Sequence, residues 1–253
     1  MTGSGTPTET AVGGNDKPIR VAIVVPTFNE AENLPVLVER VAALGVDGLG
    51  FIVVDDGSPD GTGELAERLA ASYDLGFRVI HNPGKAGLGR AYVAGFTLAL
   101  DIGAEIVVEM DADLSHPPAE LPKMLDRLAN ADVVTASRYV EGGGVDPNWS
   151  FFRQKISYWG NVGIRGILGL SIKDATSGYK AFRADALHRI DVSRLRLHGF
   201  GFQAEVAYRC QQAGLRIDQH PYTFIERTAG KSKMTVGIIA EAFIRLSWLR
   251  LRR

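Results

Sequence analysis

Short apolar runs that alternate with helical patterns over residues 19–137 constrain the fold of this chain more than any other feature. Runs rich in Ile, Val and Phe predict strands over residues 19–25, 51–56, 77–81, 105–110 and 132–137. Helical patterns fill the gaps, with one running to Leu44 and others over residues 62–73 and 87–101. This alternation predicts an α/β domain in which right-handed crossovers build a mostly parallel sheet flanked by helices.

The chain is predicted to divide into a tail, one large domain and a terminal helix. Its 253 residues, 45% of them hydrophobic, can bury a full core, and we expect one domain over residues 19–234. Residues 1–18 are rich in Gly, Thr, Ser and Asn and lack the layout of a signal peptide, which predicts a flexible tail. Residues 235–253 are apolar but contain charged side chains, so we expect a basic amphipathic helix rather than a bilayer span. The alternative is a terminal helix packed against the core.

The overall net charge of −1 hides an asymmetry along the chain. Residues 1–136 carry 9 Lys and Arg against 20 Asp and Glu, a net charge of −11, whereas residues 137–253 carry 19 against 9, a net charge of +10. An acidic part suits cations and metal-bound polyanions, and a basic part suits phosphates or an anionic membrane surface. The alternative is that both sets are ordinary solvated faces that pair with each other in the folded chain.

Polar and acidic side chains collect where three of the predicted strands end, at Asn29 and Glu30, at Asp55 and Asp56, and at Asp111 and Asp113. Open α/β sheets bind their ligands beyond the carboxyl ends of the strands. Hard cations such as Mg²⁺ or Mn²⁺ take oxygen ligands and complete their shell with substrate phosphates and water. Asp111 and Asp113 therefore predict a metal-diphosphate site. An isolated Asp-x-Asp could instead be a solvated turn before Pro117.

Several other kinds of chemistry lack their motifs in this sequence. No Gly-x-Gly-x-x-Gly follows the first predicted strand, and Lys85 lacks the glycine and hydroxyl spacing of a Walker A loop. No His/Cys cluster has zinc spacing, and there is no Gly-x-Ser-x-Gly elbow. His116 and His188 are predicted to be structural rather than catalytic. The single cysteine, Cys210, falls in an apolar helical pattern and is predicted to be a buried, inert thiol.

Seven ordered blocks of this sequence resemble those of dolichol- or polyprenol-phosphate mannose synthases. The blocks are Pro26-Thr-Phe-Asn-Glu30, Asp55-Asp-Gly-Ser-Pro-Asp-Gly-Thr62, Gly84-Lys-Ala-Gly-Leu-Gly89, Asp111-Ala-Asp-Leu-Ser-His116, Ser137-Arg-Tyr139, Asp174-Ala-Thr-Ser-Gly-Tyr179, and Arg227 with Gly230-Lys-Ser-Lys233. These synthases are inverting family 2 glycosyltransferases with a Rossmann-like GT-A fold. The resemblance implies transfer of mannose from GDP-mannose to a polyprenyl phosphate, with Mg²⁺ or Mn²⁺ as cofactor.

The resemblance also implies roles for residues on the donor side. The nucleotide would be bound by Pro26, Thr27, Asn29, Glu30, Asp55, Asp56, Lys85, Asp111 and Ala112. Asp111 and Asp113 would hold the metal that neutralises the leaving diphosphate. Ser115 stands at the position of the third metal ligand, where the resembled family can carry Gln.

On the acceptor side the resemblance implies a site for a phosphate monoester. Such a group carries about 1.5 to 2 negative charges at pH 7, so its oxygen is already ionised and needs to be positioned rather than deprotonated. Arginine suits this task, because its planar fork of donors matches a phosphate. The site would comprise Arg138, Arg153, Ser157, Arg227 and Lys231, with Asp113, Arg138 and Arg227 as the catalytic residues.

Other functions stay open at this point. The first rival is a polyprenyl-phosphate glucosyltransferase that uses UDP-glucose, and the second is a non-catalytic module that binds a sugar nucleotide. A sugar nucleotidyltransferase would need a glycine-rich loop after the first strand, which is absent. We expect a cytoplasmic protein that is peripheral at the cytoplasmic face of a membrane, held by the membrane surface or by an anchor subunit or domain, without a nucleic-acid partner.

Overall fold

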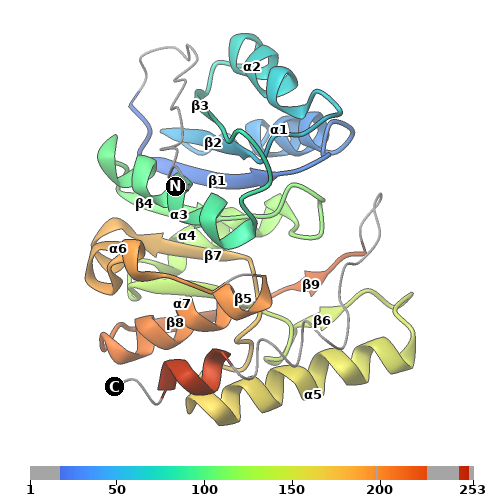
Figure 1. The fold of residues 1–253 in the computed structure, drawn as a ribbon, viewed down its shortest axis with the longest axis vertical. Helices are drawn as coiled ribbons and strands as arrows, with labels where there is room; N and C mark the ends of the chain where they lie inside the picture. The colour runs from blue at the N-terminus through green and yellow to red at the C-terminus, as the bar shows by residue number, and fades with distance from the viewer. Residues whose placement is uncertain (1–17, 198, 227–244, 251–253) are drawn as a thin grey trace, which may run out of the picture.

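A seven-stranded sheet forms the centre of the protein in the computed structural model, which describes residues 18–197, 199–226 and 245–250 (Figure 1). The strand order is β3-β2-β1-β4-β7-β5-β8. The strands are β1 (Val21–Thr27), β2 (Leu49–Asp55), β3 (Gly76–His81), β4 (Ile106–Glu109), β5 (Val133–Ser137), β7 (Lys180–Arg183) and β8 (Ile217–Pro221). All neighbouring pairs are parallel except those of β7, which runs antiparallel to both β4 and β5.

Helices cover both faces of this sheet. One face packs against α1 (Leu34–Ala42), α2 (Thr62–Ser72) and α4 (Leu121–Arg127), and the other against α3 (Leu88–Asp101), α6 (Ala184–Ile190) and α7 (Phe200–Gln212). Along β1, Ile23 belongs to the first hydrophobic cluster and Val24 to the second, because successive side chains of a strand point to opposite faces. A strand buried on both sides reads as a continuous apolar run, which is why the sequence reveals it.

The five predicted strands and the three predicted helices end within two residues of their predicted bounds. The mostly parallel α/β sheet is therefore confirmed. The sequence analysis did not predict β7 and β8 of the main sheet, the helix α4, or the short pair β6 (Gly144–Val145) and β9 (Thr223–Phe224). Two 3₁₀ turns, η1 (Pro118–Glu120) and η2 (Val192–Arg194), complete the described elements.

The longest described helix is α5 (Phe151–Leu168), at the lower edge of the molecule in Figure 1. It begins at Ser150, whose side chain accepts a hydrogen bond from the backbone of Arg153, and ends at Gly169 with φ of 65°. Both are residues that favour helix ends, since serine accepts from a free N–H group and glycine adopts the left-handed conformation. Its buried side packs with α7 in a third cluster.

Only part of the predicted terminal helix, residues 235–253, falls in the described chain. Residues 245–250 are helical, and Leu246 is fully buried in the third cluster between α5 and α7. Arg250 donates to the carbonyl oxygen of Gly166 at 3.4 Å and also to that of Ile167. These six residues thus pack against the domain, and the rest of the predicted terminal helix lies outside the described residues. The predicted tail, apart from Pro18, lies outside the described residues.

Ion pairs join the acidic and the basic parts of the chain. Asp132 pairs with Arg216 at 2.9 Å and Glu109 pairs with Lys180 at 3.3 Å. Part of the charge asymmetry is therefore neutralised within the fold, as the alternative interpretation expected.

Candidate active site

The two neighbouring aspartates that end β2 have different surroundings. Asp55 accepts hydrogen bonds from Thr27 Oγ1 at 3.0 Å, from Ser58 Oγ at 2.5 Å and from the Ser58 backbone at 2.9 Å. Asp56 accepts from Asn82 Nδ2 and from the Gly87 backbone, both at 2.8 Å. Asp55 therefore ties β1 to the following turn, whereas Asp56 holds the Gly84–Gly89 loop in front of α3.

The predicted nucleotide residues after β1 form a tight turn against the start of α2. Asn29 has a φ of 61°, and its backbone N–H donates to Ser58 Oγ at 3.0 Å. The N–H of Glu30 donates to Thr62 Oγ1 at 3.0 Å. Lys85 lies 4.2 Å from the centre of the Phe28 ring, which brings the glycine-rich loop to the same turn. The ends of β1 and β2 and this loop thus share one edge of the sheet, while half-buried Pro26 is still part of β1.

The Asp-x-Asp pair follows β4 at the same edge, because β4 pairs in parallel with β1. Asp111 Oδ1 accepts a hydrogen bond from the hydroxyl of Tyr92 at 2.9 Å, and its side chain is 28% exposed. Asp113 is 5% exposed, so it is not the solvated turn residue that the alternative interpretation expected. Ala112 between them is buried.

Ser115 is fully buried and turned toward Asp113. Its hydroxyl donates to Asp113 Oδ1 at 2.6 Å and its backbone N–H donates to the same oxygen at 3.1 Å. In this arrangement Ser115 orients the second aspartate. Its role as a third metal ligand stays a prediction.

His116 closes this loop from inside the protein. It is 2% exposed, stacks on Tyr179 at 5.2 Å between ring centres, and accepts the backbone N–H of Asp111 on Nδ1 at 3.1 Å. Burial lowers the pKa of His116, which keeps the ring neutral and lets Nδ1 act as an acceptor. The ring supports the loop, in agreement with the structural role expected from the sequence.

A buried polar network that the sequence analysis missed lies beneath the aspartates. Glu109 is fully buried and accepts from Lys180 Nζ at 3.3 Å and from Gln203 Nε2 at 2.6 Å. Lys180 also donates to Gln203 and to the backbone oxygen of Ser177. Burial raises the pKa of Glu109 to about 7, against the opposing effect of Lys180. The network joins β4, β7 and α7, and no motif marks it because its members are distant in sequence.

Arg138, at the end of β5, is held in a buried ion pair with Asp174. Its Nε and Nη2 donate to the two carboxylate oxygens at 2.7 and 2.8 Å, and Nη2 also donates to Thr176 Oγ1 at 2.7 Å. The two side chains are 8% and 0% exposed. Burial alone would lower the pKa of Arg138, but Asp174 outweighs it and raises that pKa, so the guanidinium stays charged. Asp174 lay in a block of the resemblance but had no assigned role.

Two of the other predicted acceptor residues lie one turn apart on α5. Arg153 pairs with Glu226 and lies 3.9 Å from the Trp149 ring centre, while Ser157 Oγ is 2.8 Å from the hydroxyl of Tyr139. Because Tyr139 follows Arg138 directly, Ser157 and Arg138 belong to one neighbourhood. Arg227 and Lys231 lie outside the described residues.

The loop from Asp174 to Gly178 connects the aspartates to Arg138. At its start Asp174 pairs with Arg138, and at its end a Cβ atom on Gly178 would lie 3.6 Å from Asp111 Oδ2 and 3.3 Å from His116 Cε1. The loop precedes the antiparallel strand β7, which places it at the edge where β4 and β5 end. Among the described residues, Arg138 and Asp111 therefore lie at the two ends of one short loop.

Comparison with known proteins places the chain among glycosyltransferases. A family model described as glycosyl transferase family 2 matches residues 22–191. An undecaprenyl-phosphate mannosyltransferase from Micrococcus luteus is 44% identical over 229 residues, which cover 90% of this chain and 93% of that protein. A polyprenol monophosphomannose synthase from Mycolicibacterium smegmatis is also 44% identical over 229 residues, which cover 90% of this chain and 86% of that protein.

A solved structure shows the same fold at lower identity. Glucosyl-3-phosphoglycerate synthase from Mycobacterium tuberculosis, in complex with Mn²⁺, uridine diphosphate and glucosyl-3-phosphoglycerate, matches with a TM-score of 0.63 at 21% identity. The match covers 91% of this chain and 79% of that one. The resemblance to polyprenol-phosphate mannose synthases is confirmed by the two relatives at 44% identity. The chain is an enzyme of the GT-A fold and belongs to glycosyl transferase family 2.

Proposed function

We propose that this enzyme transfers mannose from GDP-mannose to a polyprenyl phosphate, with inversion, and releases GDP. The names of its two relatives at 44% identity support mannosyl transfer to such a lipid. The observation that carries the proposal is the loop from Asp174 to Gly178, which reaches Arg138 at one end and Asp111 at the other. Residues suited to a metal-bound diphosphate thus lie beside a fixed arginine suited to a second phosphate.

The donor set at Asp111 and Asp113 fits a divalent cation. Both side chains offer carboxylate oxygens, the ligands that Mg²⁺ and Mn²⁺ prefer. Two carboxylates suffice for such an ion, since Mg²⁺ usually completes its shell with substrate phosphates and water. When bound, the cation would neutralise charge on the leaving diphosphate. Structures of the fold relative contain Mn²⁺ with a uridine nucleotide, and we propose Mg²⁺ or Mn²⁺ here.

The nucleotide would lie along the ends of β1 and β2. It would contact Asp56 and the turn through Asn29 and Glu30, with Lys85 on the adjoining loop. A carboxylate such as Asp56 can accept hydrogen bonds from ribose hydroxyls or from the N1–H and amino groups of guanine. Asp55 would serve beside it. Both carboxylates also accept hydrogen bonds within the protein, Asp55 from Thr27 and Ser58 and Asp56 from Asn82 and Gly87, and each keeps acceptor capacity for a ligand.

The acceptor phosphate would lie between Arg138, Arg153 and Ser157. One of its oxygens attacks the anomeric carbon of mannose, a new C–O bond forms, and the bond to the GDP oxygen breaks on the opposite side. The phosphate is already ionised, so this chain needs to orient it rather than remove a proton. Asp174 keeps the Arg138 guanidinium charged and fixed in direction. The guanidinium therefore does not need to reorient when the phosphate binds.

Donor choice separates this function from its closest rival. Labelled GDP-mannose and UDP-glucose, offered separately with a polyprenyl phosphate, should give lipid-soluble label from GDP-mannose. Label from UDP-glucose alone would assign the enzyme as a polyprenyl-phosphate glucosyltransferase.

Substitutions test the two halves of the site. Asp111→Asn and Asp113→Asn should abolish transfer at saturating Mn²⁺ or Mg²⁺, whereas the exposed Asp126→Asn serves as a matched control. Arg153→Ala should weaken acceptor use far more than GDP binding, by about tenfold or more, since a hydrogen bond to a charged group contributes about 1.5 to 3 kcal/mol. Wild-type turnover in both aspartate variants would reject the metal site. If Arg153→Ala weakens GDP binding as much as acceptor use, Arg153 belongs to the donor site instead.

We also propose that α5 is the element that meets the membrane. Among the described residues no helix has the length and hydropathy needed to cross a bilayer. However, Phe151, Phe152, Ile156 and Trp159 are 72%, 75%, 42% and 63% exposed on neighbouring turns of α5. A helix that exposes aromatic side chains beside a basic residue such as Lys155 suits the surface of an anionic membrane. The lipid phosphate would then reach Arg153 and Ser157 on the adjacent side of the same helix.

Vesicle binding tests this assignment. Replacing Phe152 and Trp159 by serine should reduce sedimentation with anionic vesicles and activity on long-chain acceptors, while activity on short, detergent-soluble acceptors persists. Added salt should weaken binding, because attraction to a charged surface falls within a Debye length. If the double variant binds vesicles like the wild-type enzyme, the terminal segment or a partner recruits the protein to the membrane instead of α5. Deletion of residues 237–253 is a poorer test, since it removes the buried Leu246.

A further inference from the structure

Tyr92 contacts the first of the two aspartates from the interior of the protein. Its hydroxyl donates to Asp111 Oδ1 at 2.9 Å, and the side chain is fully buried in α3. The ring stacks on Phe202 of α7 with a centre distance of 5.7 Å and an interplanar angle of 5°. Because the ring is fixed between two helices, the position of the hydroxyl is set by packing and does not depend on Asp111.

The helix that carries Tyr92 also contacts the carboxylate at the end of β2. The backbone N–H of Gly87, just before α3, donates to Asp56 Oδ2 at 2.8 Å. Two residues further, a Cβ atom on Gly89 would lie 2.5 Å from the backbone oxygen of Leu197, so the helix packs closely against that segment. The start of α3 therefore touches both the proposed nucleotide carboxylate and, through Tyr92, the proposed metal carboxylate.

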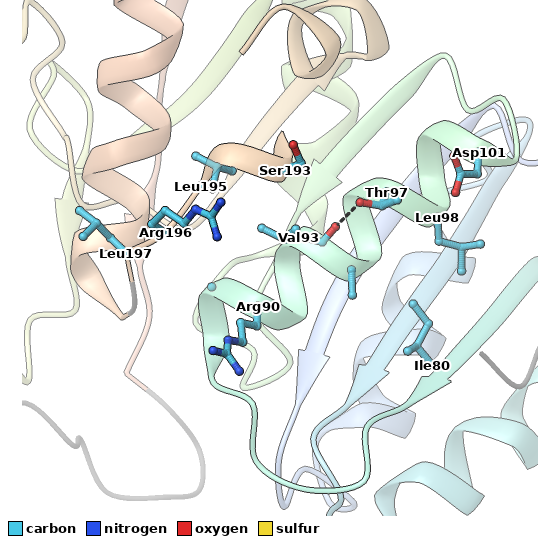
Figure 2. Close-up of a pocket in the computed structure, with 12 residues that line it drawn as sticks. Ile80, Arg90, Val93, Thr97, Leu98, Asp101, Ser193, Leu195, Arg196 and Leu197 are labelled. Atoms are coloured by element: carbon cyan, nitrogen blue, oxygen red, sulfur yellow. Dashed lines mark hydrogen bonds between the residues drawn. The ribbon is translucent and has the colours of Figure 1, made fainter. Parts of the chain in front are cut away.

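Further along α3, its contact with this segment opens into a pocket. Val93, Thr97 and Leu98 border a cavity of about 530 Å³ between this helix and the segment from Ser193 to Leu197 (Figure 2). The close contact at Gly89 and the stack of Tyr92 on Phe202 therefore hold the first half of α3 in place.

We propose that Tyr92 is a positioning residue for the metal ligand Asp111; this inference rests on the metal site of the proposed function. A hydrogen bond to one carboxylate oxygen restricts rotation of the side chain and fixes the direction of the ligand. Groups that orient metal ligands in this way typically contribute a factor of about 10 to 100 in metal affinity or activity. Tyr92 would therefore set how well Asp111 receives the cation and, with it, the diphosphate.

The test compares Tyr92→Phe with wild-type enzyme by direct metal binding. The variant keeps the aromatic ring and its stack and removes only the hydroxyl. Free Mn²⁺, measured by electron paramagnetic resonance in the presence of saturating GDP, should reveal an affinity about 10 to 100 times weaker. The GDP affinity in EDTA and the melting temperature should stay close to wild type, and excess Mn²⁺ should recover most of the mannosyl transfer.

Two further variants separate the possible outcomes. Tyr208→Phe removes a hydroxyl from another buried tyrosine, far from the aspartates on α7, and should leave Mn²⁺ binding unchanged. Asp111→Asn should lose Mn²⁺ binding altogether; if it does not, the proposed metal site itself fails. If Asp111→Asn loses Mn²⁺ while Tyr92→Phe binds it like wild type, the positioning role of Tyr92 is refuted. It is equally refuted if Tyr92→Phe lowers GDP affinity in EDTA and the melting temperature along with metal affinity.

Discussion

The buried pair of Arg138 and Asp174 allows a sharp prediction about stability. Asp174→Asn keeps the size of the side chain but removes the negative charge that faces the guanidinium. In the native protein that guanidinium makes two hydrogen bonds to Asp174, at 2.7 and 2.8 Å, and its side chain is 8% exposed. The substitution therefore leaves a cation buried without its counter-charge.

The size of the effect follows from this burial. Removing one partner of a buried ion pair destabilises a protein by about 3 to 5 kcal/mol, because the remaining charge has lost its compensation. For a chain of this length each kcal/mol lowers the melting temperature by about 2 to 4 °C, so a fall of about 6 to 20 °C is expected. A matched surface pair joins Arg127 to Asp218 at 2.8 Å with side chains 41% and 42% exposed. Asp218→Asn should cost about 0 to 1 kcal/mol, since solvent screens an exposed pair.

Thermal denaturation followed by circular dichroism measures both variants at pH 7. A double variant, Arg138→Met with Asp174→Leu, separates folding from catalysis. It should regain much of the lost stability, because apolar side chains often replace a buried ion pair without loss. It should not regain transfer to the acceptor if Arg138 binds the phosphate. Equal melting temperatures for Asp174→Asn and Asp218→Asn would refute the reasoning from burial.

Three further outcomes can be checked. Burial raises the pKa of Glu109 to about 7 from an ordinary value of 4.5. The folded state therefore keeps the Glu109 carboxyl protonated up to a higher pH than the unfolded chain does. Stability should therefore fall as the pH rises between these values, by about 3 kcal/mol, and Glu109→Gln should flatten that slope in urea titrations. Cys210 is 1% exposed and burial raises its pKa to about 12, so Ellman's reagent at pH 8 should label it only after unfolding. Gly89→Ala should destabilise the protein because its Cβ would meet a backbone oxygen at 2.5 Å, whereas Gly160→Ala in α5, with open space around the added atom, should be neutral or stabilising in thermal melts.

Strands β1 to β5 were predictable because they form apolar runs that are buried by helices on both faces. In β1, for example, Ile23 and Val24 point to opposite helical layers, and the resulting run of β-branched residues cannot be mistaken for a surface strand. The strand β7 was not predictable in the same way. It has four residues and begins with Lys180, whose charge is buried only because Glu109 and Gln203 receive it. No local pattern reveals a partner that lies 71 residues away.

The candidate site likewise has parts that could be predicted from the sequence and parts that could not. The Asp-x-Asp pair was predictable because both residues follow one strand in sequence. The distinction between Asp55 and Asp56 was not, since it depends on Thr27 and Gly87 from other elements. The contact between Tyr92 and Asp111 likewise joins a helix to a loop after a different strand. Sequence order identifies the groups that carry the chemistry, whereas the contacts that orient them arise from tertiary packing.

The place of β7 in the sheet has a consequence for synthesis on the ribosome. The strand β4 pairs with β1 on one edge, but its other edge waits for β7, which is complete only at Arg183. At about 5 to 20 residues per second, roughly 4 to 15 s pass between the emergence of these two strands. During that interval the nascent sheet presents an unpaired edge, which is where strands of other chains can add. The brevity of β4, four residues from Ile106 to Glu109, limits what such a chain could bind while translation continues.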